Sequence, residues 1–88
     1  MENKRLPIGT VLLLKESTKR IMVTGYYQRT RDSDKLWDYA GCLFPEGFVA
    51  ADKIFLFDDE QIEKVYAYGY QDQEFFAFSD EVKKLVNE

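Results

Sequence analysis

The most restrictive feature of this sequence is a series of short runs rich in β-branched and aromatic residues, separated at close intervals by polar turn segments. Runs bounded in this way are typical of β-strands. The first two lie so close together that they predict an antiparallel hairpin. The predicted main strands are residues 10–15, 20–29, 36–44 and 53–57, and residues 48–52 form a link or a further short strand.

The second predicted strand, residues 20–29, indicates which side chains share a face of the sheet. Regular alternation places Ile21, Val23 and Tyr27 on one face of this strand and Tyr26 on the other. Gly25 in the middle of the run predicts a bulge or a sharp coil, as a small barrel needs.

A short helical turn is predicted directly after the strand at 53–57. Asp58 can cap this turn, and Gln61 follows three residues later, which is the spacing of a capping box. Phe57 and Ile62 have the spacing of a hydrophobic staple across the same turn. Residues 65–68 then predict a closing strand.

The C-terminal residues predict an amphipathic helix. Two caps fit its start, Asp72 or Ser79, and both remain open. Its apolar residues recur at helical spacing, namely Phe75, Phe78, Val82, Leu85 and Val86.

The order of these elements predicts a mainly β fold, or an α+β fold if the helix is counted. We expect a small SH3-like barrel or a curled antiparallel sheet of about five strands, with the C-terminal helix covering an edge or a mouth. The length of 88 residues predicts a single domain over 1–88. Within it we expect a flexible lead at 1–5, a β-rich core at 6–70 and a helical segment at 71–88.

The inventory of reactive side chains is small. The sequence has no histidine and one cysteine, Cys42, so it offers no Ser-His or Cys-His pair and no zinc site made from these residues. A glycine-rich phosphate loop is also missing. We therefore expect no catalytic residue, no cofactor and no metal, and a protein that is not an enzyme. Cys42 is expected to be a small buried hydrophobe.

Charge and hydropathy narrow the class of partner. The net charge is −4 and the pI about 4.8, which argues against binding to nucleic-acid backbones. No signal peptide or membrane-spanning run is visible, so we expect a cytoplasmic protein without membrane contact. Small barrels that bind nucleic acid remain the alternative.

Aromatic residues are frequent, at 16% of the chain, and supply the candidate partner-binding positions. Neighbouring strands concentrate them, so they can form a peptide-binding groove or an aromatic cage. The same rings can instead be cross-strand core pairs. The candidate residues are Tyr26, Tyr27, Trp37, Tyr39 and Phe44.

An acidic triplet, Asp58, Asp59 and Glu60, has two interpretations. The first is a metal site. The second is a helix N-terminus, which favours negative charge and fits the predicted cap. The capping interpretation accounts for the triplet fully.

Three stretches together resemble a bacterial family known as domain of unknown function 4176. They are LPIGTVLLLK with KRIMVTG, then DYAGCLFPEGF, and then FLFDDEQIEKVYAYGY, so that the similarity covers residues 6 to about 70. The central string is the most specific. Its signature residues are Asp38, Tyr39, Gly41, Cys42, Pro45, Glu46 and Gly47.

The resemblance implies a Gram-positive source and a link to type VII secretion of LXG-type toxins. It implies an accessory, adaptor or chaperone-like protein whose partner is a secreted toxin or its targeting factor. An immunity protein that neutralises a toxin is the alternative, and the resemblance brings no catalytic residue. A homodimer is also possible, because an edge strand or the helical stripe could support one.

Overall fold

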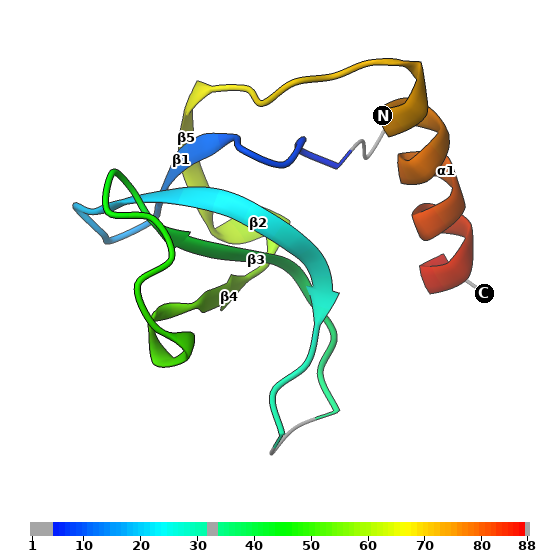
Figure 1. The fold of residues 1–88 in the computed structure, drawn as a ribbon. Coiled ribbons are helices and arrows are strands. Elements are labelled where there is room, and N and C mark those ends of the chain that lie inside the picture. The colour runs from blue at the N-terminus through cyan, green and yellow to red at the C-terminus, as the bar shows by residue number, and fades with distance from the viewer. Residues whose placement is uncertain (1–4, 32–33, 88) are drawn as a thin grey trace.

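Five antiparallel strands form one curled sheet, and a helix follows it at the C-terminus (Figure 1). The computed structural model describes residues 5–31 and 34–87, the side chains of 83 and 85–87 excepted. The strands are β1 (Val11–Leu14), β2 (Arg20–Gln28), β3 (Trp37–Leu43), β4 (Phe55–Phe57) and β5 (Ile62–Ala67). Two 3-10 helices, Ala51–Lys53 and Asp59–Gln61, precede β4 and β5 respectively. The helix α1 is Gln73–Asn87.

The strands lie in the order β4-β3-β2-β1-β5, so each of the first four pairs with its neighbour in the sequence and β5 returns to β1. Within the described ranges, β4 pairs only with β3 and β5 only with β1. The sheet is therefore open, which selects the curled sheet over the closed barrel among the two predicted architectures. The predicted hairpin of β1 and β2 is confirmed, with Leu12 opposite Ile21.

A bulge in β2 changes which tyrosine faces the core. Val23 lies opposite Gly41, and Gly25 lies opposite the next residue of β3, Ala40. Thr24 is therefore an extra residue in β2, with no residue of β3 directly opposite it. The extra residue reverses the alternation beyond this point, and Tyr26 packs against the core cluster. The bulge predicted at Gly25 is confirmed, whereas the prediction that Tyr26 and Val23 lie on opposite faces is wrong.

The core lies on the concave side of the sheet and is formed by residues from four strands. Leu12, Ile21, Val23, Tyr39 and Phe57 are buried and in contact. The Tyr39 and Phe57 rings stack with centroids 5.4 Å apart. Burying an aliphatic or aromatic side chain of this size contributes about 1.5–3 kcal/mol, so this cluster supplies much of the stability of a chain without a disulfide.

Strand β4 is shorter than predicted, and residues 48–50 form no strand. The chain turns back after β3, and the Gly47 N–H donates to the Leu43 carbonyl oxygen at 2.7 Å. The returning chain thus pairs with β3 at Leu43. Strand β4 pairs with β3 only from Tyr39 to Gly41.

Strand β5 starts three residues earlier than predicted, because the preceding turn is only one 3-10 turn long. The predicted capping box is present there, and the Asp58 N–H donates to Gln61 Oε1 at 2.8 Å. The Lys15 N–H then donates to the Gln61 carbonyl oxygen at 2.8 Å, so pairing with β1 begins as soon as the turn ends. Both predicted staple residues, Phe57 and Ile62, pack in the core region.

Helix α1 begins at Gln73, so the earlier of the two predicted starts is correct. Asp72 caps it, since its Oδ1 accepts the Phe75 N–H at 2.9 Å. The described side chains that are most buried along α1 follow a helical stripe: Phe75, Ser79 and Val82. The predicted positions Leu85 and Val86 lie outside the described side chains.

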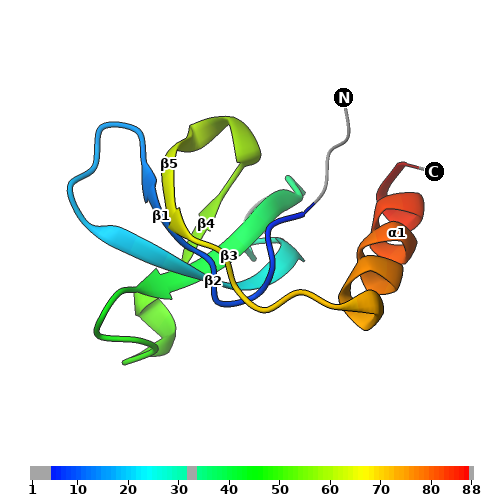
Figure 2. The same ribbon diagram turned by 90° about the horizontal axis from the view of Figure 1, so that it is seen from above.

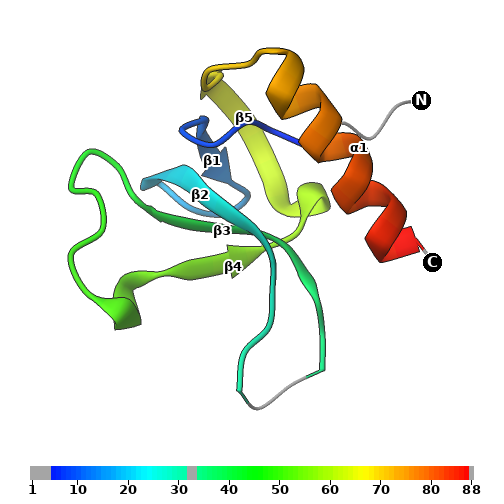
Figure 3. The same cartoon turned by 45° about the vertical axis from the view of Figure 1, so that its right-hand side comes forward.

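The helix stands to one side of the sheet, joined to β5 by an extended segment (Figure 2). The chain that leads into β1 comes from the same side (Figure 3). Contact between helix and sheet includes the rings of Phe78 and Tyr26, 5.8 Å apart. Among the described residues, no helix has the length and apolar character needed to cross a membrane.

Candidate functional site

The three predicted partner-binding tyrosines lie close together where β2 pairs with β3, near α1. Tyr26 and Tyr39 lie opposite each other on β2 and β3, with ring centroids 5.9 Å apart. Tyr39 is completely buried, so for this ring the structure agrees with the alternative of a cross-strand core pair. The sequence left both uses open, because a tyrosine serves equally well as a core ring or as an interface anchor.

Arg5 completes this cluster from the N-terminal segment. Its guanidinium carbon lies 4.9 Å from the centroid of the Tyr27 ring and 5.4 Å from that of Tyr39. Arg5 Nη1 is also 3.6 Å from Asp38 Oδ1. Arg5 was predicted to be part of a flexible lead; it is instead packed against two rings and a carboxylate. The rest of that lead, residues 1–4, lies outside the described residues.

Burial governs the titration of the cluster. It raises the pKa of Tyr26 to about 12, and the neighbouring Tyr39 adds to the rise. Burial also raises the pKa of Tyr27 and of Tyr39, although the positive charge of Arg5 partly opposes both shifts. The pKa of Arg5 is lowered by burial, but the interactions with Tyr27, Tyr39 and Asp38 outweigh that effect and leave it raised. At neutral pH the cluster is therefore a cation among uncharged phenols.

The other two predicted aromatic residues, Trp37 and Phe44, have different cationic neighbours. The Lys35 ammonium is 4.6 Å from the centroid of the Trp37 ring. The Arg20 guanidinium is 5.2 Å from the centroid of the Phe44 ring, next to the turn that follows β3. Trp37 and Phe44 thus each face a cation other than Arg5.

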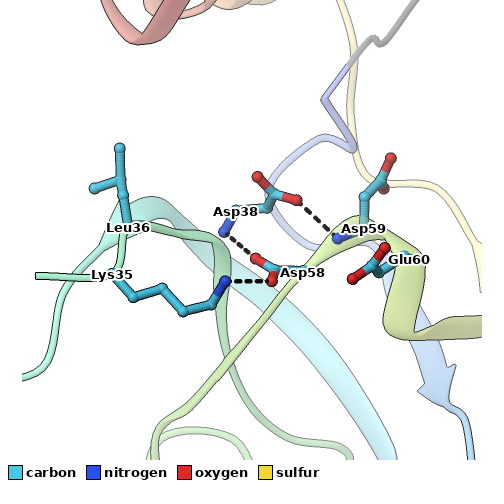
Figure 4. A pocket seen from close by; sticks show the side chains of 6 residues that line it. All are labelled: Lys35, Leu36, Asp38, Asp58, Asp59 and Glu60. Carbon is cyan, nitrogen blue, oxygen red and sulfur yellow. Dashed lines mark hydrogen bonds and ion pairs between the residues drawn. The ribbon is translucent and has the colours of Figure 1, made fainter. Parts of the chain in front are cut away.

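The signature residue Asp38 connects β3 to the turn that follows β4 through reciprocal hydrogen bonds with Asp58 and Asp59, here called the Asp38 bracket (Figure 4). The Asp38 N–H donates to Asp58 Oδ1 at 3.1 Å, and Asp38 Oδ2 accepts the Asp59 N–H at 2.9 Å. Lys35 Nζ lies 2.9 Å from Asp58 Oδ2, and this hydrogen bond raises the pKa of Lys35. The acidic triplet thus has a structural use at the helical turn.

Several other signature residues also have structural contacts. A Cβ on Gly41 would lie 2.6 Å from Ile21 Cγ2 and 2.7 Å from the Met22 carbonyl oxygen, so only glycine fits there. Cys42 is buried, as predicted.

The remaining signature residues form the turn after β3. Gly47 has φ +82°, a conformation that favours glycine. Glu46 Oε1 lies 2.8 Å from Lys19 Nζ. The hydrogen bond from Lys19 lowers the pKa of Glu46. Exposed Pro45 belongs to the same turn.

An open depression of about 470 Å³ lies beside the Asp38 bracket (Figure 4). In the part of the chain that the structure describes, no three histidine, cysteine or acidic side chains are grouped so that they could hold a metal ion. The carboxylates here instead accept backbone N–H groups and pair with Lys35. The residues lining it are Lys35, Leu36, Asp38, Asp58, Asp59 and Glu60.

One exposed aromatic feature was not predicted as a site. Tyr66, Tyr68 and Tyr70, here called the tyrosine strip, follow one another at every second residue where β5 continues into the extended segment. Tyr68 is 63% and Tyr70 80% exposed. The alternation Tyr-Ala-Tyr-Gly-Tyr was the available signal, since alternate residues of an extended chain point to one side.

Gly69 holds the strip in place. Its N–H donates to Thr10 Oγ1 at 3.1 Å, and an added Cβ would come within 1.9 Å of the Ile8 carbonyl oxygen. Because Gly69 faces inward so closely, Tyr68 and Tyr70 on either side face solvent. The strip is therefore fixed by the fold.

Two further groups of exposed apolar side chains lie elsewhere. In α1, Phe76 and Phe78 are exposed, and Phe78 keeps 46% of its surface although it contacts Tyr26. Around the loop before β4, Phe48, Val49 and Phe55 are exposed. The first group lies in the element that follows the tyrosine strip, whereas the loop lies away from α1 (Figure 1).

Comparison with known protein families gives a match. The sequence model of a family described as Domain of unknown function (DUF4176) matches residues 5–78. No curated protein and no solved structure matches the chain.

Proposed function

The chain belongs to the family described as Domain of unknown function (DUF4176), and we propose that it is a non-enzymatic accessory protein that binds another protein. The tyrosine strip is the observation that carries this proposal. Tyrosine is enriched at protein interfaces because its ring offers apolar area and its hydroxyl a hydrogen bond at low entropic cost. A small chain that exposes three tyrosines at alternate positions has a surface suited to binding another protein.

The geometry around the strip supports this role. The backbone of the strip is held by the Gly69 contact with Ile8 and Thr10, so little backbone conformational entropy is lost when a partner binds. Phe76 follows in α1, and Ile8 on the neighbouring segment is also exposed. The acidic chain, with a net charge of −4, suits a partner with basic groups around an apolar contact.

The proposed partner is a secreted LXG-type toxin or its helical targeting factor, and the proposed place of action is the cytoplasm of a Gram-positive bacterium. This part of the proposal rests on the genomic setting that the family resemblance implies. In this role the protein would be an adaptor or chaperone of type VII secretion that contacts its cargo before export.

Affinity purification from the native host, with mass spectrometry of the bound proteins, tests the proposal. Tagged wild-type protein is compared with the variant Tyr68→Ser/Tyr70→Ser, whose substitutions are exposed and leave the core intact. Phe48→Ser/Val49→Ser is the matched control, because it removes two exposed apolar side chains from the distant loop. We expect wild type and control to recover an LXG-type toxin or its companion, and the strip variant to lose at least nine-tenths of it.

Three results would count against the proposal in different ways. A wild-type bait without a reproducible partner, or with mainly ribosomal proteins, would contradict protein binding linked to secretion. Loss of the partner in the loop variant alone would move the interface to Phe48 and Val49. If the chain alone protects a cell from the recovered toxin, its role would be immunity.

A further inference from the structure

The segment that precedes β1 lies on the tyrosine cluster as a bound peptide would. The Arg5 guanidinium lies against the rings of Tyr27 and Tyr39, at 4.9 and 5.4 Å from their centroids. Asp38 approaches the same guanidinium to 3.6 Å. Aromatic faces together with a carboxylate are the surroundings that proteins use to recognise an arginine side chain.

The backbone of the next residue is recognised as well. The Leu6 N–H donates to the Tyr39 hydroxyl at 3.2 Å, and the Tyr26 hydroxyl donates to the Leu6 carbonyl oxygen. The Leu6 side chain packs against the core cluster. Two tyrosine hydroxyls thus hold both backbone polar groups of one residue, Leu6, a type of contact that does not depend on the side chain carried there.

The first part of the segment is not built into the sheet. Residues 5–7 lie outside every strand, and the Thr10 N–H donates to the Pro7 carbonyl oxygen at 3.1 Å in a turn just before β1. Backbone hydrogen bonds to β2 begin only at Gly9, whose N–H donates to the Val23 carbonyl oxygen at 2.9 Å. Gly9 in this turn has φ +92°. The fit is also incomplete, since Arg5 Nε is buried and has no hydrogen-bond partner among residues 5–31 and 34–87. Arg5 and Leu6 can therefore leave without the loss of a strand pair.

We propose that Tyr26, Tyr27, Tyr39 and Asp38 form a peptide-binding site for an arginine followed by an aliphatic residue. Arg5 and Leu6 fill this site in cis, and an extended segment of a partner protein with the same chemistry replaces them. The contacts of the cis segment define what the site recognises.

Charge favours a cationic occupant. Asp58, Asp59 and Glu60 lie next to Asp38 around the same depression, so the approach to the site is acidic. The Tyr39 hydroxyl lies 3.4 Å from Asp59 Oδ1. A partner segment that carries an arginine would be attracted there, whereas an acidic segment would be repelled.

The arginine site and the tyrosine strip are formed by different residues, so each can be tested without the other. A strip variant that loses its partner reports on Tyr68 and Tyr70, whereas the peptide experiment below reports on the arginine site.

Displacement of the cis segment tests the site in the full-length protein. Arg5→Glu places a carboxylate beside Asp38 and repels the segment. The probe is the peptide acetyl-Arg-Leu-Pro-Ile-amide, with acetyl-Ala-Leu-Pro-Ile-amide as its control, and binding is measured by calorimetry and by shifts of the tyrosine ring signals in NMR spectra. We expect the variant to bind the arginine peptide at least tenfold more tightly than wild type does, and tenfold more tightly than the alanine peptide.

Arg5→Ala is the second variant, in case Arg5→Glu disturbs folding as judged by circular dichroism. It removes the cis guanidinium without adding charge, and it should bind the arginine peptide more tightly than wild type. Equal affinity of wild type and both variants, or equal affinity for the two peptides, would overturn the proposal. A wild-type dimer in light scattering that Arg5→Glu converts to a monomer would overturn it too, because the occupant would then be a second copy of this chain.

Discussion

At the scale of single residues, Gly41 shows how a family signature position can serve packing. An added Cβ would lie 2.6 Å from Ile21 Cγ2, 2.7 Å from the Met22 carbonyl oxygen and 3.3 Å from Phe57 Cε1. One of these neighbours is backbone and the others are core side chains, so none can move cheaply. We expect Gly41→Ala to lower the free energy of unfolding by about 1–3 kcal/mol, the usual cost of overpacking, as measured by urea denaturation.

Gly25 provides the matched control for Gly41. It also lies in a paired strand, but a Cβ there would meet atoms no closer than 3.8 Å. Gly25→Ala should therefore change the free energy of unfolding by no more than about 0.5 kcal/mol. Similar losses in both variants would mean that the close approach at Gly41 is not what requires glycine.

The signature residues share this structural character. Asp38 pairs with backbone groups of the turn after β4, Tyr39 and Cys42 are buried, and Gly47 adopts a positive φ. A pattern of this kind marks the fold of the family. The tyrosine strip lies outside the signature, whereas the proposed arginine site uses two signature residues, Asp38 and Tyr39, which contact Arg5 and Leu6 in addition to their structural partners.

At the scale of elements, α1 depends on its own cap more than on the sheet. The Asp72 carboxylate accepts the Phe75 N–H at 2.9 Å, while Phe78, which contacts Tyr26, stays 46% exposed. Asp72→Ala should cost the helix about 1 kcal/mol. We expect about fivefold faster hydrogen exchange of amides in the first turns of α1, with unchanged exchange in β2 and β3.

The control for this prediction is Asp72→Asn, which keeps an oxygen that can cap the helix and should leave exchange nearly unchanged. If Asp72→Ala accelerated the amides of β2 as much as those of α1, helix and sheet would unfold as one cooperative unit. The separation of α1 from the sheet would then be smaller than the contacts indicate.

At the scale of the whole molecule, the buried phenols predict how stability depends on pH. Burial raises the pKa of Tyr26 to about 12 and also raises the pKa of Tyr39 and Tyr27. An unfolded tyrosine has a pKa of about 10. Because the folded pKa values are higher, this stability is fully present below about pH 10 and is lost as pH rises toward about 12.

Urea denaturation from pH 8 to above pH 11 measures this decline. Tyr26→Phe should be less stable at pH 8, because it loses the hydrogen bond to Leu6, but its stability should fall less steeply above pH 10. An identical slope in wild type and Tyr26→Phe would show that Tyr26 does not contribute to the alkaline loss. The experiment concerns the cluster that joins β2, β3 and the N-terminal segment, and hence the integrity of the whole fold.

Much of the architecture follows from local sequence. The β-type runs predict all five strands to within three residues at each end. The letters Asp-Asp-Glu-Gln specify the capping box, and Asp72 with the apolar spacing specifies α1. These features depend on residues that are close together in the chain, so their free energies are already set by the local sequence.

Which side chains face the core, and where the candidate binding sites lie, depended on the tertiary structure. A bulge opposite β3 turned Tyr26 into the core, the contact of Gly69 with Ile8 and Thr10 exposed the tyrosine strip, and packing against Tyr27 and Tyr39 ordered Arg5. Each of these outcomes requires partners from distant parts of the sequence. Whether a tyrosine is core or surface is set by which strand lies opposite it and in which register, because one shifted residue exchanges the two faces of a strand.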